Sequence, residues 1–469
     1  MSLLIKNAQF TAIDSEDEVL TGSLLIEKGK IAKIFPGEPA QIVTADETID
    51  ASGKLIIPGM TNAHYHSYSN LLKGTTSNLP LEIWSLYTIA YGHSLDDEDI
   101  YLAVLLGAAD MIRSGITGCI DHFPHLLRVE SALKAYEKSK INVAFAPMIQ
   151  DISDEEFLGL PQENQLVRSI DELRDFFTRL VKDWHLKNDK IRIMLGPNAP
   201  QRCSKAALAL CREVSNQYGL DVHTHLSETK VQKDMGDRTF KRGLVGHLDE
   251  AGLLNSRLSA AHAIWLNENE IDLLKEKEVT IIHNPASNMM LGSGFAPVSQ
   301  YVTRQIPIAL GTDASNCGIS HNSFEMMRLA LMMSRVNNRN YQEWLEPKDV
   351  FKMAAVSGAE VITESKRGKI AEGYDADLVF LDKNSKTFIS EEDSVSQMIL
   401  YENGDSVDSV MIMGDWVYRD KKILAFDEQQ VIQQIQEKAE KIRNGAKGAL
   451  ALAERKRRSV EKFYQHFYN

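Results

Sequence analysis

Residues 59–66, "GMTNAHYH", decide the fold because they join a strand pattern to two histidines spaced two residues apart. In an extended segment, residues i and i+2 point to the same face, so His64 and His66 can reach one common point. Tyr65 then points to the opposite face, where we expect core. The pair alone fits metal ligands and polar loop residues equally well, so the answer must come from the rest of the chain.

Strand-like segments recur after this stretch and alternate with helical patterns. The segments between them, such as 97–115 and 204–219, carry apolar residues at helical spacing. The further apolar runs cover residues 118–123, 142–149, 191–197, 220–228, 258–266, 279–285 and 306–315. Together with 59–66 these runs make eight β-α units. The pattern predicts an α/β fold built on a (β/α)8 TIM-type barrel.

Alternating segments also stand at the two ends of the chain. Residues 2–13, 22–37 and 54–60 precede the barrel pattern, and strand patterns return in "ADLVFLD" and "SVMIMGDWVYRDKKIL". We expect both sets to form one small β-sandwich domain. The sequence thus predicts four parts, namely residues 1–58 (first part of the sandwich), 59–363 (barrel, catalytic), 364–424 (second part of the sandwich) and 425–469 (helical tail). Within the tail, we expect the basic cluster from Arg455 to Arg458 to be a solvated face.

Composition narrows the function classes. The formal net charge of -13 argues against nucleic acid and anionic membranes as partners, because both attract positive surfaces. The first residues lack the apolar core of a signal peptide, and no run approaches the roughly 20 apolar residues of a membrane span. The four cysteines show no CxxC pairing. We therefore expect a cytoplasmic protein that acts on a small molecule.

Polar residues recur at the carboxyl ends of the predicted barrel strands, where the active sites of such barrels lie. They are His64, His66, His225, His262, His283 and Asp313. A single histidine in such a place is most often structural, but several at matching strand ends predict a shared site, because buried polar groups without a partner cost stability. Imidazole nitrogen and carboxylate oxygen suit zinc or iron, with an open position for water.

At this point a resemblance emerges. The motifs "PGMTNAHYH", "HTHLSE", "AAHAIWL", "HNPASNMMLGSG" and "GTDASN" occur in the order found in the amidohydrolase superfamily. More narrowly, they resemble the branch that holds methylthioadenosine/S-adenosylhomocysteine deaminases, guanine deaminase and the triazine hydrolases. The resemblance covers nearly the whole chain, including the late motif "IAEGYDADLVFLD". It implies one divalent metal ion, Zn2+ by preference and Fe2+ as the alternative, because the bridging lysine of binuclear relatives is missing from "IRIMLGPNAP".

The resemblance also implies the role of each residue. The expected metal ligands are His64, His66, His225 and Asp313, and the expected catalytic residues are Glu228, His262 and Asp313. A hydroxide generated at the metal would attack an amino-bearing ring carbon, Glu228 would shuttle a proton to the ring nitrogen, and ammonia would leave. His223 is expected either to pack or to support a ligand.

Substrate contacts are expected from Trp84, His122, Asn198, Gln201 and His283. For Trp84, stacking on a heteroaromatic ring and packing of a loop onto the barrel are both open. Asn198 stands where nucleoside-type deaminases of this branch have a histidine that contacts the substrate. This departure from the family pattern speaks against adenosine-like substrates.

The sequence thus predicts a metal-dependent hydrolytic deaminase of an amino-substituted N-heterocycle of the purine, pterin, pyrimidine or triazine type. The alternative keeps the site but changes the bond cleaved, as in a triazine chlorohydrolase, an alkylamine hydrolase or a cyclic amide hydrolase. A catalytically inactive scaffold is a third hypothesis, which the retention of every expected ligand disfavours. By resemblance to the family, we expect a homo-oligomer.

Overall fold

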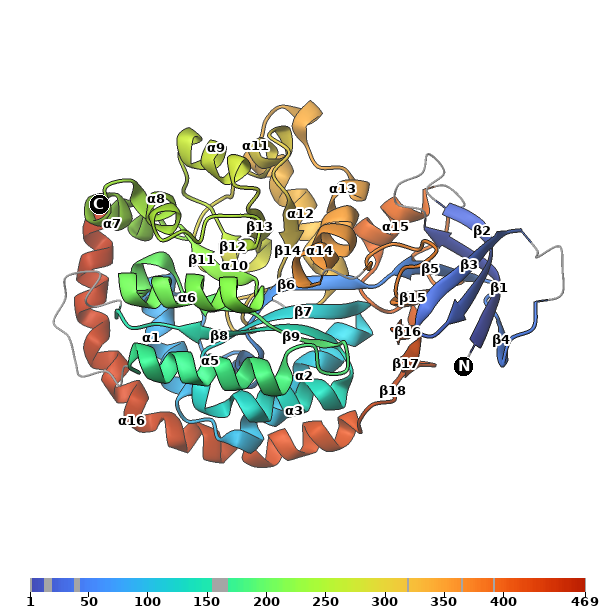
Figure 1. The fold of residues 1–469 in the computed structure, drawn as a ribbon, viewed down its shortest axis with the longest axis horizontal. Helices are drawn as coiled ribbons and strands as arrows, with labels where there is room; N and C mark the ends of the chain where they lie inside the picture. The colour runs from blue at the N-terminus through green and yellow to red at the C-terminus, as the bar shows by residue number, and fades with distance from the viewer. Residues whose placement is uncertain are drawn as a thin grey trace.

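The computed structural model describes residues 2–11, 19–37, 43–153, 168–318, 320–363, 366–390 and 393–468. The fold is a mixed α/β arrangement in which a sheet built from both terminal regions lies beside a larger body of strands covered by helices (Figure 1). The predicted boundary at residue 364 falls outside the described residues.

Each of the eight segments predicted as a barrel strand contains a strand. The segment 191–197 holds two short strands, because pairing is interrupted between them. The strands are β6 (Met60–Tyr65), β7 (Ile116–Phe123), β8 (Asn142–Ile149), β9 (Ile191–Ile193), β10 (Gly196–Pro197), β11 (Val222–Leu226), β12 (Leu258–His262), β13 (Thr280–His283) and β14 (Ile308–Leu310). Nearly all their residues are buried, as expected of parallel strands covered by helices.

These strands pair in parallel as two arcs. One arc has the order β10-β8-β7-β6 with β9 paired to β8, and the other has the order β11-β12-β13-β14. Isolated parallel bridges link Leu195 to Val222 at one edge and Tyr65 to Asp313 at the other. The carboxyl ends of β6, β11 and β14, which carry the predicted ligands, therefore lie on the same side of the strands.

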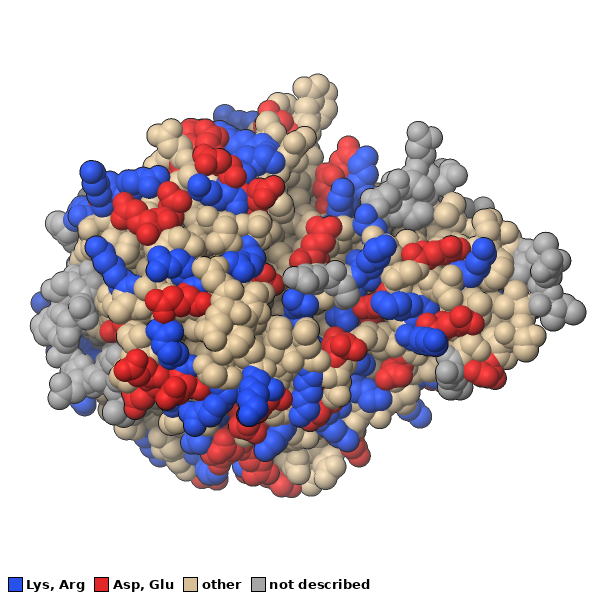
Figure 2. Space-filling view, viewed as in Figure 1, with Lys and Arg blue, Asp and Glu red and all other residues tan. Residues whose placement is uncertain are grey.

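Helices follow most of these strands and cover them (Figure 1). After β6 come the 3-10 turn η1 (Ser67–Leu72), α1 (Leu81–Gly92) and α2 (Asp97–Arg113). The others up to β14 are α3 (Val129–Ser139), α5 (Ile170–Trp184), α6 (Lys205–Tyr218), α7 (Lys230–Thr239), α8 (Gly243–Glu250), α9 (Glu268–Glu276), α10 (Pro285–Met290) and α11 (Val298–Thr303). Beyond β14 lie α12 (Ser323–Asn337), α13 (Pro347–Lys352) and α14 (Gly358–Ile362). Over the face drawn in Figure 2, basic and acidic side chains are interspersed.

The terminal sheet unites the two ends of the chain, as predicted. Its strands are β1 (Ser2–Thr11), β2 (Val19–Glu27), β3 (Lys30–Pro36), β4 (Glu47–Asp50), β5 (Lys54–Pro58), β15 (Leu378–Asp382), β16 (Val407–Ile412), β17 (Asp415–Arg419) and β18 (Lys422–Ile423). The two sets join where β15 pairs antiparallel with β5, with Val379 opposite Ile57. Phe10, Leu24 and Leu378 share one buried cluster, so burial of apolar surface holds the sets together. Helix α15 (Ser394–Tyr401) lies between β15 and β16 in sequence.

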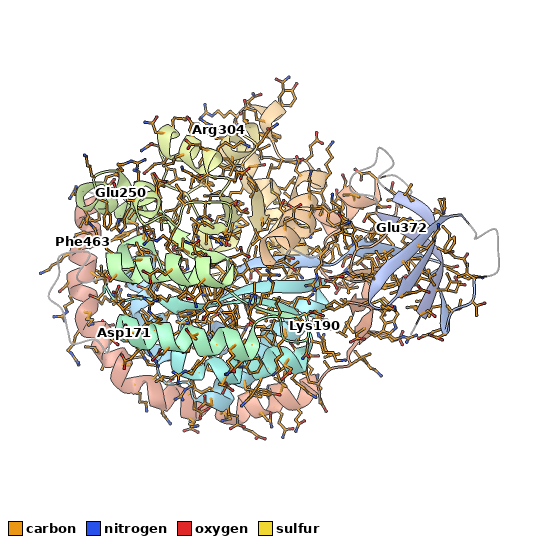
Figure 3. The ribbon with its side chains drawn as sticks, in the orientation of Figure 1. Asp171, Lys190, Glu250, Arg304, Glu372 and Phe463 are labelled. Atoms are coloured by element: carbon orange, nitrogen blue, oxygen red, sulfur yellow. The ribbon has the colours of Figure 1, made fainter. Side chains whose placement is uncertain are left out.

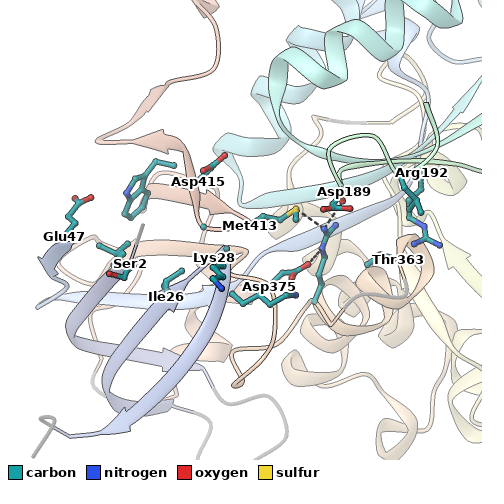
Figure 4. Close-up of a pocket in the computed structure, with 17 residues that line it drawn as sticks. Ser2, Ile26, Lys28, Glu47, Asp189, Arg192, Thr363, Asp375, Met413 and Asp415 are labelled. Atoms are coloured by element: carbon teal, nitrogen blue, oxygen red, sulfur yellow. Dashed lines mark hydrogen bonds and ion pairs between the residues drawn. The ribbon is translucent and has the colours of Figure 1, made fainter. Parts of the chain in front are cut away.

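A crevice of about 870 Å³ separates part of this sheet from the larger body (Figure 4). Arg367 spans it: its Nε donates to Asp375 at 2.8 Å and its Nη2 donates to the Asp189 carbonyl oxygen at 3.3 Å. Asp375 lies next to β15, so this buried guanidinium fixes the sheet against the loop before β9.

Helix α16 (Glu428–Tyr468) starts beside the terminal sheet and runs along the larger body to its opposite side (Figure 1). Figure 3 shows Phe463 of α16 on the same side of the molecule as Glu250, at the end of α8. Ion pairs attach the helix on the way: Glu428 pairs with Arg113, and the Nζ of Lys438 lies 2.7 Å from the Glu98 carboxylate. Among the described residues, no helix is both long and apolar enough to cross a membrane.

Candidate functional site

Four of the predicted ligands converge on one buried point. His64 lies in β6, His66 directly follows it, His225 lies in β11, and Asp313 follows β14. The Nε2 atoms of His66 and His225 are 3.4 Å apart. Asp313 Oδ1 lies 3.2 Å from His66 Nε2 and 3.6 Å from His64 Nε2. The structure therefore brings together all four residues that the resemblance assigns to the metal.

Hydrogen bonds on the far side of the rings orient the same nitrogen of each histidine toward this point. His66 Nδ1 donates to the His122 carbonyl oxygen at 2.6 Å, and His225 Nδ1 donates to the Asn198 carbonyl oxygen at 2.7 Å. A carbonyl oxygen only accepts, so Nδ1 carries the proton and a neutral ring presents its Nε2 lone pair. His64 Nδ1 instead faces His223 Nε2, at 2.8 Å.

This set of donors fits a divalent cation. Three imidazole nitrogens and a carboxylate oxygen are ligands that zinc accepts, and His64 Nε2 is buried with no hydrogen-bond partner among the described residues. Burial lowers the pKa of His64 to about 4 and that of His225 well below its usual value, so both rings are neutral at pH 7. Burial also lowers the pKa of His66, but Asp313 outweighs it and the net shift is upward. A cation at this point would compete with that proton.

Two further side chains border the point. His262, at the end of β12, has its Nε2 3.7 Å from Glu228 Oε2 and 3.7 Å from Asp313 Oδ2. Its Nδ1 donates to Asn288 Oδ1 at 3.0 Å, which turns Nε2 toward the two carboxyl groups. Burial raises the pKa of Glu228. Burial also acts to raise the pKa of Asp313, but the adjacent His64 and His66 rings outweigh it and hold that pKa well below its usual value. One acid is thus biased toward its protonated form and the other toward its charged form.

The backbone at this site adopts unusual angles. His262 has φ of +73° and Asp313 has φ of +63°, in a region that residues with a Cβ rarely occupy. Such conformations persist where the surroundings enforce them, and they cluster at functional sites. Here the Asp313 N–H donates to the His64 carbonyl oxygen at 2.9 Å, which anchors the turn after β14 to β6.

A buried network supports the same turn from behind. Thr312 N donates to Asn62 Oδ1 at 3.0 Å, and Thr312 Oγ1 lies 2.7 Å from His321 Nδ1. The other ring nitrogen of His321 lies 2.7 Å from Ser315 Oγ and 3.1 Å from Asn70 Oδ1. These bonds tie the segment that follows Asp313 to β6 and η1, and so fix Asp313 relative to the histidine pair.

A cavity of about 630 Å³ opens onto this centre. Its walls include His66, His225, Glu228, His262 and Asp313, together with residues of α1 and α16. The volume lies in the range of pockets that enclose small organic ligands.

The predicted substrate residues divide into two groups. Trp84, Asn198 and Gln201 line the cavity, and the Trp84 Nε1–H is held by the Asn316 carbonyl oxygen at 3.2 Å. His122 and His283 are buried but are not among the lining residues. His122 Nε2 donates to the Gly196 carbonyl oxygen at 3.3 Å, and burial lowers the pKa of His283 to about 3. Both lie at strand ends, yet they belong to the packing around the centre.

Helix α16 contributes cavity residues that sequence reasoning missed. Ala449, Leu452, Ala453, Lys456 and Val460 all line the cavity. Of the basic cluster predicted to be a solvated face, Arg455 and Arg458 are exposed. Lys456 is half-buried and lines the cavity, and Arg457 is half-buried with its Nε 2.6 Å from Glu461 Oε1. The sequence of α16 does carry small and branched apolar residues at helical spacing, which predict a buried face. This pattern does not indicate which part of the protein that face packs against.

Comparison with known proteins agrees with these observations. Residues 55–417 match the model of the amidohydrolase family. A 5'-deoxyadenosine deaminase of Methanobrevibacter smithii is 31% identical over 452 residues, which cover 95% of this chain and 99% of the relative. A 5-methylthioadenosine/S-adenosylhomocysteine deaminase of Thermococcus sibiricus is 33% identical over 415 residues, which cover 88% of this chain and 93% of the relative.

Among solved structures, an adenosine deaminase from Xanthomonas campestris with bound zinc superimposes with a TM-score of 0.85 at 24% identity, over 94% of this chain and 98% of that one. At this identity the likeness shows a shared fold. The match over most of the chain and the relatives above 30% identity establish the family. The chain belongs to the amidohydrolase family, and like the deaminases it resembles it is a hydrolase of carbon–nitrogen bonds.

Proposed function

We propose that this protein is a metal-dependent hydrolytic deaminase of adenosine-type compounds, which replaces the amino group of the purine ring by oxygen and releases ammonia. The observation that carries the proposal is that His66, His225 and Asp313 of the centre share a cavity wall with a buried glutamic acid, Glu228. The third histidine, His64, lies behind this wall with its Nε2 3.6 Å from Asp313. Deamination needs both a nucleophile near neutral pH and an acid that protonates the ring.

The proposed metal ligands are His64, His66, His225 and Asp313. A divalent ion held by these four residues would supply a nucleophile at neutral pH by lowering the pKa of water. Zn2+ is the favoured ion and Fe2+ the alternative, since both accept this ligand set.

Side chains of the protein donate and accept the protons of the reaction. Burial raises the pKa of Glu228, so its carboxyl can donate a proton to the ring nitrogen beside the attacked carbon. Asp313, held ionised by His64 and His66, accepts a proton from the nucleophile. His262, oriented by Asn288, faces both carboxyl groups and stabilises the charge that develops between them. Asp313 then passes its proton to the amino group, the new hydroxyl returns a proton to Glu228, and cleavage of the carbon–nitrogen bond releases ammonia and leaves a carbonyl on the ring.

The choice of an adenosine-type compound rests on the relatives. Several that are 30% identical or more are named as deaminases of 5'-deoxyadenosine or of 5-methylthioadenosine and S-adenosylhomocysteine. The absence of a histidine at Asn198 argues the other way, but this position is still a polar part of the cavity wall: Asn198 Oδ1 accepts from Arg202 Nη1 at 3.1 Å. Gln150, which accepts from Asn198 Nδ2 at 2.7 Å, and Arg202 line the same cavity, so this part of its wall remains polar.

The test is ammonia release from a panel containing adenosine, 5'-deoxyadenosine, 5-methylthioadenosine, guanine and a chlorinated triazine. We expect turnover of at least one adenosine-type compound, with the amino group as the leaving group. Chloride release from the triazine without ammonia release from any member would support the alternative hydrolase chemistry instead.

Further expectations accompany this proposal. We infer that the two parallel arcs together form the (β/α)8 barrel, since bridges link them at both edges. The division into sandwich, barrel and helical tail, the cytoplasmic location and a homo-oligomeric state remain predictions; sedimentation of the purified protein tests the last of them.

A further inference from the structure

We propose that His223, together with Ser259, is a positioning residue that selects the ring tautomer of His64 in which Nε2 is free to bind the metal ion. This inference rests on the proposed metal site, in which His64 is a ligand. His223 lies two positions before the ligand His225 in the "HTH" of β11, with Thr224 between them.

The three side chains form a buried chain of hydrogen bonds. His64 Nδ1 lies 2.8 Å from His223 Nε2, and His223 Nδ1 lies 2.7 Å from Ser259 Oγ. Ser259 Oγ in turn donates to the Val222 carbonyl oxygen at 3.2 Å. Ser259 sits in β12, directly opposite His223 in the register of the two strands. All three side chains are withdrawn from solvent, so no water competes for these bonds.

Hydrogen-bond donation along these three side chains has a preferred direction. When Ser259 donates to the Val222 carbonyl, its oxygen accepts from His223 Nδ1–H, and His223 Nε2 then accepts from His64 Nδ1–H. His64 Nε2 is left as a lone pair that faces Asp313 and the ligand histidines. In the reverse direction the Ser259 bond to Val222 is lost and a proton sits on His64 Nε2, which has no hydrogen-bond partner among the described residues. The first direction therefore satisfies more groups.

This arrangement distinguishes His64 from the other two ligands. His66 and His225 each donate Nδ1–H to a backbone carbonyl, which fixes their tautomers unconditionally. The partner of His64 is another histidine, which can accept or donate. Ser259 and the Val222 carbonyl resolve this ambiguity, as partners behind metal-binding histidines commonly do.

The same contacts exclude His223 itself as a ligand. Its Nε2 is engaged by His64 and its Nδ1 by Ser259, so neither ring nitrogen is free for a cation. His64, His122 and His223 do approach one another closely enough to suggest a second metal site. The two hydrogen bonds of His223 account for that approach without one.

The experiment measures the dissociation constant for Zn2+ of the metal-free full chain, by competition with a chromogenic chelator of known affinity. We compare wild type, His223→Leu, His223→Gln and Ser259→Ala. Leucine removes the acceptor, and we expect the dissociation constant to rise roughly 10–100-fold. Glutamine restores an acceptor oxygen for His64 Nδ1–H, and we expect a value within a few-fold of wild type. Ser259→Ala deletes one oxygen atom and should weaken Zn2+ binding to an intermediate degree.

Absorption spectra of the Co2+ forms provide a second measurement, since they report the ligands directly. We expect His223→Gln to keep the wild-type spectrum and His223→Leu to alter it. Zn2+ affinities that are equal in all four proteins, or that fall equally in the glutamine and leucine variants, overturn the inference. Should His223→Leu fail to fold, the Ser259→Ala comparison decides alone. Failure of wild type to bind Zn2+ or Fe2+ would instead overturn the proposed metal site.

Discussion

His66 and His225 place their Nε2 atoms 3.4 Å apart although 159 positions separate them in the sequence. Each ring is fixed from behind by a backbone carbonyl, one of β7 and one of the segment after β10. Two lone pairs held this close repel each other unless a cation lies between them. This arrangement therefore destabilises the metal-free fold, and binding of an ion offsets that destabilisation.

Replacement of His225 by alanine should release the metal ion. It removes one of the three imidazole nitrogens while leaving β11 otherwise intact, so we expect substoichiometric zinc and iron after dialysis and no restoration by added Zn2+. Elemental analysis of the purified variant measures this. His247, a histidine of α8 outside the centre, offers a control: His247→Gln should retain the wild-type metal content.

Glu228→Gln should abolish most turnover without loss of the metal. The amide keeps the shape of the side chain but cannot donate the proton, and general acid catalysis of this kind is worth roughly 10²–10⁴-fold in rate. We expect kcat to fall by that factor while KM changes little. Steady-state ammonia release and metal content, measured on the same preparation, check both halves of this prediction. Wild-type kcat in the variant would remove Glu228 from the mechanism.

Stability of the metal-free protein should fall between pH 8 and pH 5, and His321 should contribute to the slope. Burial lowers the pKa of His321 to about 4, against about 6.5 in an unfolded chain. The unfolded state thus binds a proton that the folded state refuses, and stability is lost as pH falls through 6.5 toward 4. The loss from this group at pH 5 is about 2 kcal/mol.

His321→Gln tests this claim in chelator-treated protein. The variant should be less stable at pH 8, because its bonds to Thr312 and Ser315 change, but its free energy of unfolding should vary less between pH 8 and pH 5. Urea unfolding at the two pH values gives the difference. An unchanged slope in His321→Gln would contradict the prediction.

Leu452→Gln in α16 should impair substrate binding more than chemistry. Leu452 lines the cavity and has no group that can donate or accept a proton, so we expect KM for the best substrate to rise roughly 10-fold with kcat nearly constant. Arg458→Gln, an exposed change on the same helix, should leave both constants as in wild type. A fall in kcat alone would show that α16 acts on the chemical step.

The strands and the proposed metal ligands could be predicted from the sequence. Period-2 spacing marked His64 and His66, and apolar runs marked every strand of the two arcs, because a buried parallel strand is recognisable from a few residues. Strand position does not reveal which way a side chain faces. His122 and His283 stand at strand ends like the ligands, yet they are not among the residues that line the cavity.

The path of helix α16 over the larger body could not be predicted from the sequence of the helix itself. Its helical pattern is plain, but its path depends on packing against α1 and α2 and on pairs such as Lys438 with Glu98, whose partners lie hundreds of residues earlier. Ion pairs between distant surface residues leave no periodic trace in the sequence. The cavity role of Lys456 could therefore only emerge from the folded chain.

The position of α16 has a consequence for biosynthesis. Every proposed ligand leaves the ribosome before Ala449, so a growing chain can assemble its metal centre while one wall of the cavity is still missing. During synthesis, the metal centre would then be complete before the cavity wall that selects the substrate. The same separation matters for divergence among relatives. Mutations confined to α16 can change which compounds the cavity accepts, while the strands that carry the proposed ligands stay unchanged.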